Sequence, residues 1–169
     1  MKNVIIIGGG AAGLTAARTA AERGFNVTVV ERNERPARKV MITGKGRCNV
    51  TNDTDVNGLV SAVTDKKSGR FLYSAFNAYS AEDTKEFFET YGVPLKTERG
   101  NRVFPCSDKA VDIVDALVAA AKQAGAELMT DRAVSLKTED GRVTGVVTES
   151  GRTLFADAVV VATGGLSYP

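Results

Sequence analysis

A run of glycines near the amino terminus has the spacing of a turn that binds a dinucleotide. The segment Gly8-Gly9-Gly10-Ala11-Ala12-Gly13 follows an apolar run, residues 4–7, and opens an alanine-rich helix that extends to Arg23. The first glycine of the pattern permits a tight turn, the second lets backbone amides approach a pyrophosphate, and the third lets the helix pack closely on the strand. Phosphates then meet the partly positive end of the helix. The pattern therefore predicts a pyrophosphate site that includes Gly8, Gly10, Ala11, Ala12 and Gly13.

A carboxylate at the end of the next apolar run indicates which dinucleotide is bound. Glu31 follows residues 27–30, so it is expected at the carboxyl edge of the neighbouring strand, where the adenosine ribose of a dinucleotide lies. A carboxylate accepts hydrogen bonds from both ribose hydroxyls and repels a 2′-phosphate. We therefore expect FAD or NAD rather than NADP, with Arg32 as a neighbouring contact. A glycine-rich turn without a ligand, followed by a solvated strand end, is the alternative.

The composition limits the remaining chemistry. The 169 residues, 43% of them hydrophobic, suffice for the core of one domain. The formal net charge is +2, without a basic tract, so no nucleic-acid partner is expected.

Neither a signal-peptide pattern nor an apolar stretch of membrane length is present, which predicts a cytoplasmic protein without a membrane partner. The sequence has no histidine, and Cys48 and Cys106 lack metal-ligand spacing, so no metal site is expected.

The periodicity of the chain predicts the elements that must position these residues. Helices are expected at 56–66, at 70–79, at 80–91 after a capping-box pattern, and from a cap at Ser107 or Asp108 to Gly125, with a hairpin-like element over 95–104. Strands are expected at 127–130, 133–138, 143–148, 153–155 and 158–162, three of them forming an antiparallel β-meander around Asp140-Gly141. The fold class is thus α/β, with a parallel sheet, helices and a β-meander. This arrangement, together with the glycine turn, resembles a Rossmann-like FAD/NAD(P)-binding domain of glutathione-reductase type.

Two further segments can reach the same ligand. The stretch from Arg32 to Asn52 has no sustained period and leaves the carboxyl edge of the predicted sheet, where long loops are usually functional. The last strand runs into a second glycine turn, Ala162-Thr163-Gly164-Gly165, which is what a second backbone approach to the same cofactor would look like.

Four motifs together resemble one family. They are residues 8–13, the loop Gly44-Lys45-Gly46-Arg47-Cys48-Asn49-Val50-Thr51-Asn52, residues 100–109, and the terminal residues 162–169. This set is similar to the BaiN-type, aminoacetone-oxidase-like bacterial flavoproteins, also called NAD(FAD)-utilising dehydrogenases. The loop is far more specific than the glycine fingerprint.

The resemblance implies FAD as the cofactor, with the loop from Lys39 to Asn52 running along the pyrophosphate towards the flavin. Lys39, Lys45 and Arg47 can offset phosphate charge, unless they belong to a merely solvated loop. Asn49, Thr51 and Asn52 offer neutral donors and acceptors. The remaining candidate cofactor contacts are Gly44, Gly46, Cys48, Ala133, Val134, Ala162, Thr163, Gly164 and Gly165.

In the family, a substrate domain and a returning stretch of the FAD domain follow the Ser-Tyr-Pro segment, whereas this sequence stops at Pro169. We therefore expect residues 1–169 to form the amino-terminal portion of an FAD-binding domain, without full activity by itself. The expected function is the FAD-binding part of a flavin-dependent oxidoreductase that acts on a small organic substrate, with NAD(P)H as a candidate electron donor. Family members are linked to aminoacetone oxidation and to reduction of bile-acid intermediates. The alternatives are a non-catalytic nucleotide-binding module or fragment that needs a second half for activity, and an NAD-binding dehydrogenase domain. The candidate protein partners are a complementing second half or a second copy of the chain in a homo-oligomer.

No side chain can be assigned a catalytic role from the sequence. Tyr73, Tyr79, Tyr168 and Lys45 can donate protons, but none lies in a motif. Cys48 follows Arg47, which can activate a thiol, yet Cys48 has no neighbouring cysteine for a redox disulfide. A packed, non-catalytic thiol is the favoured interpretation.

Overall fold

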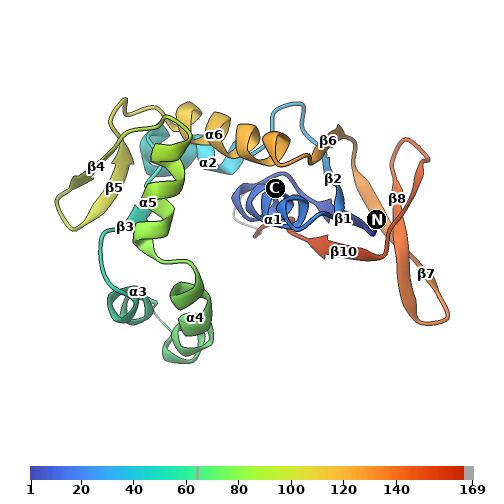
Figure 1. Ribbon diagram of the computed structural model, residues 1–169, viewed down its shortest axis with the longest axis horizontal. Coiled ribbons are helices and arrows are strands. Elements are labelled where there is room, and N and C mark those ends of the chain that lie inside the picture. Colours follow the sequence, from blue (N-terminus) through green and yellow to red (C-terminus); the bar gives the residue numbers. More distant parts are fainter. Residues whose placement is uncertain (64, 166–169) are drawn as a thin grey trace. The chain divides into compact units, whose positions relative to one another are not determined.

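The computed structural model describes residues 1–63 and 65–165. The chain forms two compact units, which are described separately below. The first unit comprises Met1–Val40 together with the segment from Leu117 onwards, and the second unit comprises Met41–Ala116. Figure 1 shows the elements of both units, coloured along the sequence.

A four-stranded parallel sheet forms the centre of the first unit. Its order is β10-β1-β2-β6, with the strands β1 (Asn3–Ile7), β2 (Asn26–Glu31), β6 (Glu127–Thr130) and β10 (Ala158–Val161). Ile7, at the end of β1, is paired with Val30 of β2 and Val161 of β10. The carboxyl ends of these strands therefore meet at one edge of the sheet, as the Rossmann-like prediction requires.

Different elements cover the two faces of this sheet. A Cβ on Gly13 of α1 (Ala11–Glu22) would lie 3.4 Å from the Ile6 side chain, so α1 packs on the Ile6 face. Ile5 instead forms a buried cluster with Val30 and Val146. Because successive side chains of a strand point to opposite faces, the meander that contains Val146 covers the other face (Figure 1). The meander consists of β7 (Ala133–Glu139), β8 (Arg142–Thr148) and β9 (Thr153–Phe155), which pair antiparallel as predicted.

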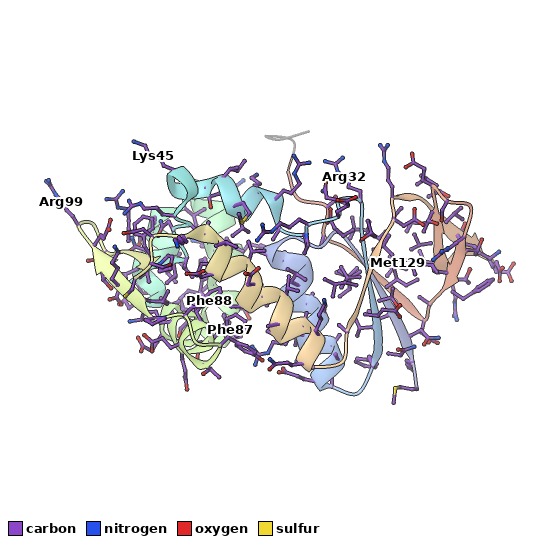
Figure 2. All side chains as sticks on the ribbon, turned by 90° about the horizontal axis from the view of Figure 1, so that it is seen from above. Arg32, Lys45, Phe87, Phe88, Arg99 and Met129 are labelled. Atoms are coloured by element: carbon purple, nitrogen blue, oxygen red, sulfur yellow. The ribbon has the colours of Figure 1, made fainter. Side chains whose placement is uncertain are left out.

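The second unit contains a small antiparallel sheet of order β3-β5-β4. Its strands are β3 (Thr51–Asn52), β4 (Leu95–Glu98) and β5 (Arg102–Pro105). Val103 and Phe104 of β5 are buried in its core. The helices are α3 (Val56–Ala62), α4 (Lys66–Ala78) and α5 (Ala81–Thr90), and α5 contacts β3 and β4. On α5 the rings of Phe87 and Phe88 lie 4.9 Å apart, edge to face (Figure 2).

Three further elements lie at or near the chain boundaries of the units. Helix α2 (Arg38–Ile42) and the short 3-10 helix η1 (Thr43–Gly46) occupy the stretch that was expected to lack structure. Helix α6 (Ala110–Gln123) carries the predicted apolar stripe, of which Ile113, Val114 and Ala121 are buried.

Two predicted helix boundaries are wrong. The helix expected at 56–66 ends at Ala62, and the next begins at Lys66 rather than Arg70. The reason is Asp65, whose carboxylate accepts hydrogen bonds from the Lys67 and Ser68 amides and so caps a new helix. The capping box of α5, in contrast, is confirmed, since Ser80 and Asp83 exchange both hydrogen bonds. Before α6 the hydroxyl of Ser107 accepts from the Lys109 amide, whereas the Asp108 carboxylate pairs with Lys96.

Candidate nucleotide-binding site

At two positions of the first turn, Gly8 and Gly13, the conformation and packing of the protein leave no room for a side chain. Gly8 has a φ of +103°, and a Cβ there would lie 2.6 Å from the Ala162 carbonyl oxygen. A Cβ on Gly13 would lie 1.9 Å from the Gly8 carbonyl oxygen, closer than any real contact. The predicted roles of these two glycines, a tight turn and close helix packing, are therefore confirmed by geometry.

Gly10 is different, because nothing in the described protein requires a glycine there. Its φ of −78° and ψ of −175° suit any residue, and a Cβ would meet no atom within 4 Å. Gly10 is the N-cap of α1, yet the described residues supply no side-chain cap and no acidic residue in the first turn. Ala11 and Ala12 are exposed. The amide groups at this helix end are thus placed to bind an anion.

Glu31 lies at the same turn. Its carboxylate accepts a hydrogen bond from the Gly9 amide at 2.7 Å through Oε2. Through Oε1 it accepts from the backbone amide of Asn33 at 2.9 Å and from the Asn33 side chain. A carboxylate has about four acceptor positions, so one remains beside Oε2 for a ribose hydroxyl. The predicted placement of Glu31 beside the glycine turn is confirmed.

Asn33 is a site residue that the sequence did not reveal. Its side chain donates to Glu31 and accepts a 3.0 Å hydrogen bond from Arg38. Asn33 therefore holds the Glu31 carboxylate in place. An asparagine two residues after a strand end is ordinary in a turn, so no sequence signal distinguished it.

The other predicted first-unit residues lie along the same edge. Ala162 donates from its amide to the Ile7 carbonyl at 2.8 Å, which brings the second glycine turn to the end of β1, and Thr163, Gly164 and Gly165 are exposed. Arg32 is exposed and follows β2 directly (Figure 2). Lys39, in α2, is also exposed. Residues 166–169 of the terminal motif, including Tyr168, lie outside the described residues.

A short segment, residues 131–134, continues this edge beyond β2. The Asp131 amide donates to the Glu31 carbonyl at 2.9 Å. The Asp131 carboxylate accepts hydrogen bonds from the hydroxyl of Ser150 at 2.5 Å and from the Arg132 amide at 2.8 Å. These hydrogen bonds, that of Ser150 above all, lower the pKa of Asp131 from 3.8 to about 2.

This depressed pKa predicts a stability change in acid. Because the folded-state value lies below the unfolded one, the contribution of Asp131 is complete above pH 3.8 and is lost as the pH falls through about 2. Urea midpoints measured between these pH values should therefore fall less steeply for Asp131→Ala than for the wild type. If the urea midpoints of the two proteins fell equally steeply with falling pH, this would contradict the lowered pKa of Asp131.

The predicted contacts of the loop lie in the second unit. They are Gly44, Gly46, Arg47, Cys48, Asn49, Thr51 and Asn52. The loop is fixed on the β-sheet of that unit, since the Val50 amide donates to the Val103 carbonyl and the Asn52 side chain donates to the Gly100 carbonyl, both at 2.9 Å. Gly44 has a φ of +57°, and a Cβ there would lie 3.2 Å from the Phe104 ring. The contacts of these residues with a cofactor stay a prediction.

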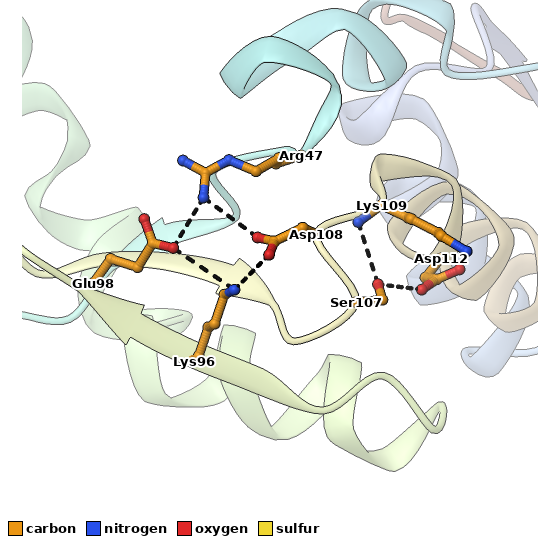
Figure 3. A network of polar contacts seen from close by, with 7 residues as sticks. All are labelled: Arg47, Lys96, Glu98, Ser107, Asp108, Lys109 and Asp112. Carbon is orange, nitrogen blue, oxygen red and sulfur yellow. Dashed lines mark hydrogen bonds and ion pairs between the residues drawn. The ribbon is translucent and has the colours of Figure 1, made fainter.

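Arg47 belongs to a network of four charges that sequence reasoning did not find (Figure 3). Its guanidinium lies 2.9 Å from Glu98 and 3.3 Å from Asp108, and 4.2 Å from the centroid of the Phe104 ring. Lys96 completes the network at 2.7 Å from Asp108. The hydrogen bond to Glu98 raises the pKa of Arg47, and that to Lys96 lowers the pKa of Asp108. Two carboxylates thus balance the two cations, so the charge of Arg47 is already compensated within the second unit.

Cys48 is packed in the second unit. The thiol is buried, and this burial raises its pKa, while Cys106 is exposed. A raised pKa disfavours the reactive thiolate, which supports the packed, non-catalytic interpretation.

Thiol labelling can check this difference. In native protein we expect a disulfide reagent to modify Cys106 rapidly and Cys48 at least about tenfold more slowly, because only thiolate that reaches solvent reacts. Both thiols should react at similar rates in denaturant. Rapid labelling of Cys48 in the folded Cys106→Ala variant would contradict the interpretation.

The described residues contain no group of three or more histidine, cysteine, aspartate and glutamate side chains able to hold a metal ion. They also include no helix with the length and apolar character needed to span a membrane.

The parallel sheet, the glycine turn and the carboxylate at the end of β2 define a Rossmann-type dinucleotide-binding protein. Residues 2–169 match the family model described as "HI0933-like protein Rossmann domain", and the chain belongs to this family. Membership implies FAD as the cofactor.

The proteins that resemble this chain in sequence or in fold are named for several different activities. The 3-dehydro-bile acid delta(4,6)-reductase of Clostridium scindens is 30% identical over 168 residues, which cover 98% of this chain and 39% of that protein. A ribosomal RNA dihydrouridine synthase of Escherichia coli is also 30% identical over 168 residues, covering 99% of this chain and 40% of that protein. The 3-ketosteroid-delta4-(5alpha)-dehydrogenase of Rhodococcus jostii RHA1 has a similar fold, with a TM-score of 0.69 at 21% identity, over 97% of this chain and 46% of that one.

The chain therefore spans about two fifths of the length of the curated relatives that it matches. One of these relatives is named for a ribosomal RNA substrate. The expectation that this protein has no nucleic-acid partner consequently stays a prediction.

Proposed function

We propose that this chain supplies the FAD-binding part of a flavin-dependent oxidoreductase that acts on a small organic substrate, with NAD(P)H as the candidate electron donor. The glycine turn holds the pyrophosphate, Glu31 holds the adenosine ribose, and the turn from Ala162 to Gly165 contacts the same cofactor. The bound flavin supplies hydride and electron transfer. The side chains of this unit bind and orient it.

The presence of a glycine at position 10 is the observation that most strongly supports this proposal. The conformation of Gly10 suits any residue and the space beside it is open. Neither folding nor packing within the described residues explains the glycine, whereas a ligand lying against the backbone does. The uncapped amino end of α1 and the Glu31 carboxylate lie beside it.

Replacing Glu31 by alanine should weaken FAD binding by about 1–3 kcal/mol, because the ribose loses its charged acceptor. The structure adds a second effect, since the Gly9 amide and Asn33 also lose their acceptor. Fluorescence titration with FAD gives the affinity, and urea denaturation gives the stability. Glu31→Gln, which keeps an acceptor oxygen without the charge, is the matched variant and should lie between alanine and wild type. Unchanged affinity in Glu31→Ala would show that the ribose lies elsewhere.

An anaerobic reduction assay tests the oxidoreductase part of the proposal. The protein loaded with FAD is mixed with NADH or NADPH, and the visible flavin absorbance is followed with and without an added electron acceptor. Bleaching by a nicotinamide and recovery on addition of the acceptor are expected of the complete oxidoreductase. Absence of bleaching in a full-length protein that retains FAD would exclude NAD(P)H as the donor.

The outer edge of the parallel sheet favours a second candidate, a nucleotide-binding module without turnover of its own. Within the described residues β10 pairs with β1 alone, and its Val160 and Val161 side chains are 39% and 63% exposed. An open apolar edge of this kind can accept another strand. If this second candidate is correct, FAD binds to the chain, but NADH or NADPH does not bleach the flavin absorbance until a complementing segment is added.

A further inference from the structure

We propose that Glu98 and Asp108 are positioning residues for cofactor binding, which act through Arg47 on the backbone of residues 44–49. In this assignment Arg47 holds the loop on the β4–β5 hairpin of the second unit and does not serve as a counter-charge for the pyrophosphate. The inference rests on the proposed function, because it assumes that residues of this loop contact the bound FAD.

The loop has an unusual backbone conformation. Four of its residues have positive φ values, between +57° and +84°, namely Gly44, Lys45, Gly46 and Cys48. Arg47, with a φ of −98°, lies between two of them. A left-handed conformation is unfavourable for a residue with a Cβ, such as Lys45 or Cys48, and it persists only where surrounding contacts hold it. Contacts outside the loop are therefore needed to keep this conformation.

The side chain of Arg47 supplies such contacts with the β4–β5 hairpin (Figure 3). Its Nη1 atom donates to Glu98, the last residue of β4, at 2.9 Å, and to Asp108, which follows β5, at 3.3 Å. The guanidinium also lies 4.2 Å from the centroid of the ring of Phe104, a buried residue of β5. Hydrogen bonds between a cation and a carboxylate are stronger than neutral ones, and partial burial of Arg47 limits their screening. Arg47 thus fixes the middle of the loop on the hairpin.

Lys96 keeps the two carboxylates in place for Arg47. Its Nζ atom lies 2.7 Å from Asp108 and 3.7 Å from Glu98. The four groups carry two positive and two negative charges, so the network is neutral without a ligand. A phosphate that approached Arg47 would also meet the two carboxylates, and their repulsion would offset the attraction. This arrangement suits a role in orienting the loop rather than in attracting an anion.

The two roles of Arg47 predict opposite effects of removing the carboxylate charges. The double variant Glu98→Gln/Asp108→Asn keeps the shape of both side chains. If the carboxylates position the loop, this variant should bind FAD about tenfold more weakly than the wild type in a fluorescence titration. If Arg47 instead neutralises the pyrophosphate, its charge is released in the variant, which should bind FAD as tightly as the wild type or more tightly. The second result would overturn the proposal.

Arg47→Ala completes a cycle with this double variant. Because the three residues act as one unit, Arg47→Ala and the triple variant should bind FAD equally weakly. Losses that simply add would also overturn the proposal, since they would show independent roles. Glu82→Gln is the matched control, because it removes the charge of another carboxylate of the second unit, 2.6 Å from Lys85, and should keep the wild-type affinity.

Limited proteolysis without FAD tests the attachment of the loop separately. Trypsin cleaves after arginine, and an arginine held in folded structure is cleaved only when that structure opens. We expect cleavage after Arg47 to be at least about fivefold faster in the double variant than in the wild type or Glu82→Gln. Cleavage after Arg142, in the first unit, is the reference for global opening and should not change.

The proteolysis result separates a failure of this inference from a failure of the proposed function. Equal rates of cleavage after Arg47 in the double variant and the wild type would overturn the positioning role, even if the double variant bound FAD poorly. Failure of the wild type to bind FAD would instead overturn the proposed function, whether or not the loop is held by Arg47.

Discussion

Substitution of Gly10 by valine is expected to weaken FAD binding by about 100-fold or more, close to 2.7 kcal/mol, while the protein stays folded. The backbone at Gly10 is extended, and nothing within 4 Å obstructs a Cβ, so the valine fits the protein. Its side chain then occupies the space in which the pyrophosphate must approach the helix amides. Fluorescence titration with FAD measures the binding, and circular dichroism reports the fold.

Thr19→Val is the control for this experiment. It adds the same side chain to α1 at an exposed position away from the turn, where it should leave FAD affinity unchanged. Wild-type affinity in Gly10→Val would mean that the phosphates do not lie against this helix end.

Substitution of Gly13 by alanine should have the opposite result, a loss of stability of about 3 kcal/mol or more. The new Cβ would lie 1.9 Å from the Gly8 carbonyl oxygen, so α1 or the turn must move. The turn has little room to move, since it is packed so closely on the Ala162 backbone that a Cβ on Gly8 would lie 2.6 Å from the Ala162 carbonyl oxygen. Urea denaturation followed by circular dichroism gives the change in unfolding free energy.

Gly10→Ala is the matched control for Gly13→Ala. It adds one methyl group three residues earlier, where no atom lies within 4 Å, and should change stability by no more than about 1 kcal/mol. Equal stabilities for the two variants would show that helix and strand are not in such close contact.

Sequence reasoning succeeded where neighbouring residues decide the structure. The glycine turn, the strand before it and Glu31 at the end of β2 follow from local conformation and from the rule that consecutive parallel strands end at one edge. The capping box of α5 and the meander turn at Asp140-Gly141 are equally local.

The sequence could not reveal pairings between distant positions. Arg47 was expected to offset phosphate charge or to lie in a solvated loop, and its ion pairs were not foreseen. Its partners are 51 and 61 residues away, and their approach depends on how β4 and β5 fold beside the loop. Asp131 and Ser150, 19 residues apart, meet because the meander turns back on itself. The break between the two helices α3 and α4 was predicted but was placed after residue 66, because the sequence does not show that the Asp65 side chain caps a new helix that begins at Lys66.

Equilibrium binding of FAD to the purified full chain tests the central claim most directly. After removal of unbound FAD by ultrafiltration, the visible flavin absorbance of the retained protein gives the stoichiometry. We predict about one FAD per chain, displaced by excess ADP and poorly by NADP, because the ligand is held by its adenosine and pyrophosphate at the turn and at Glu31. A colourless protein that retains no added FAD would contradict the assignment.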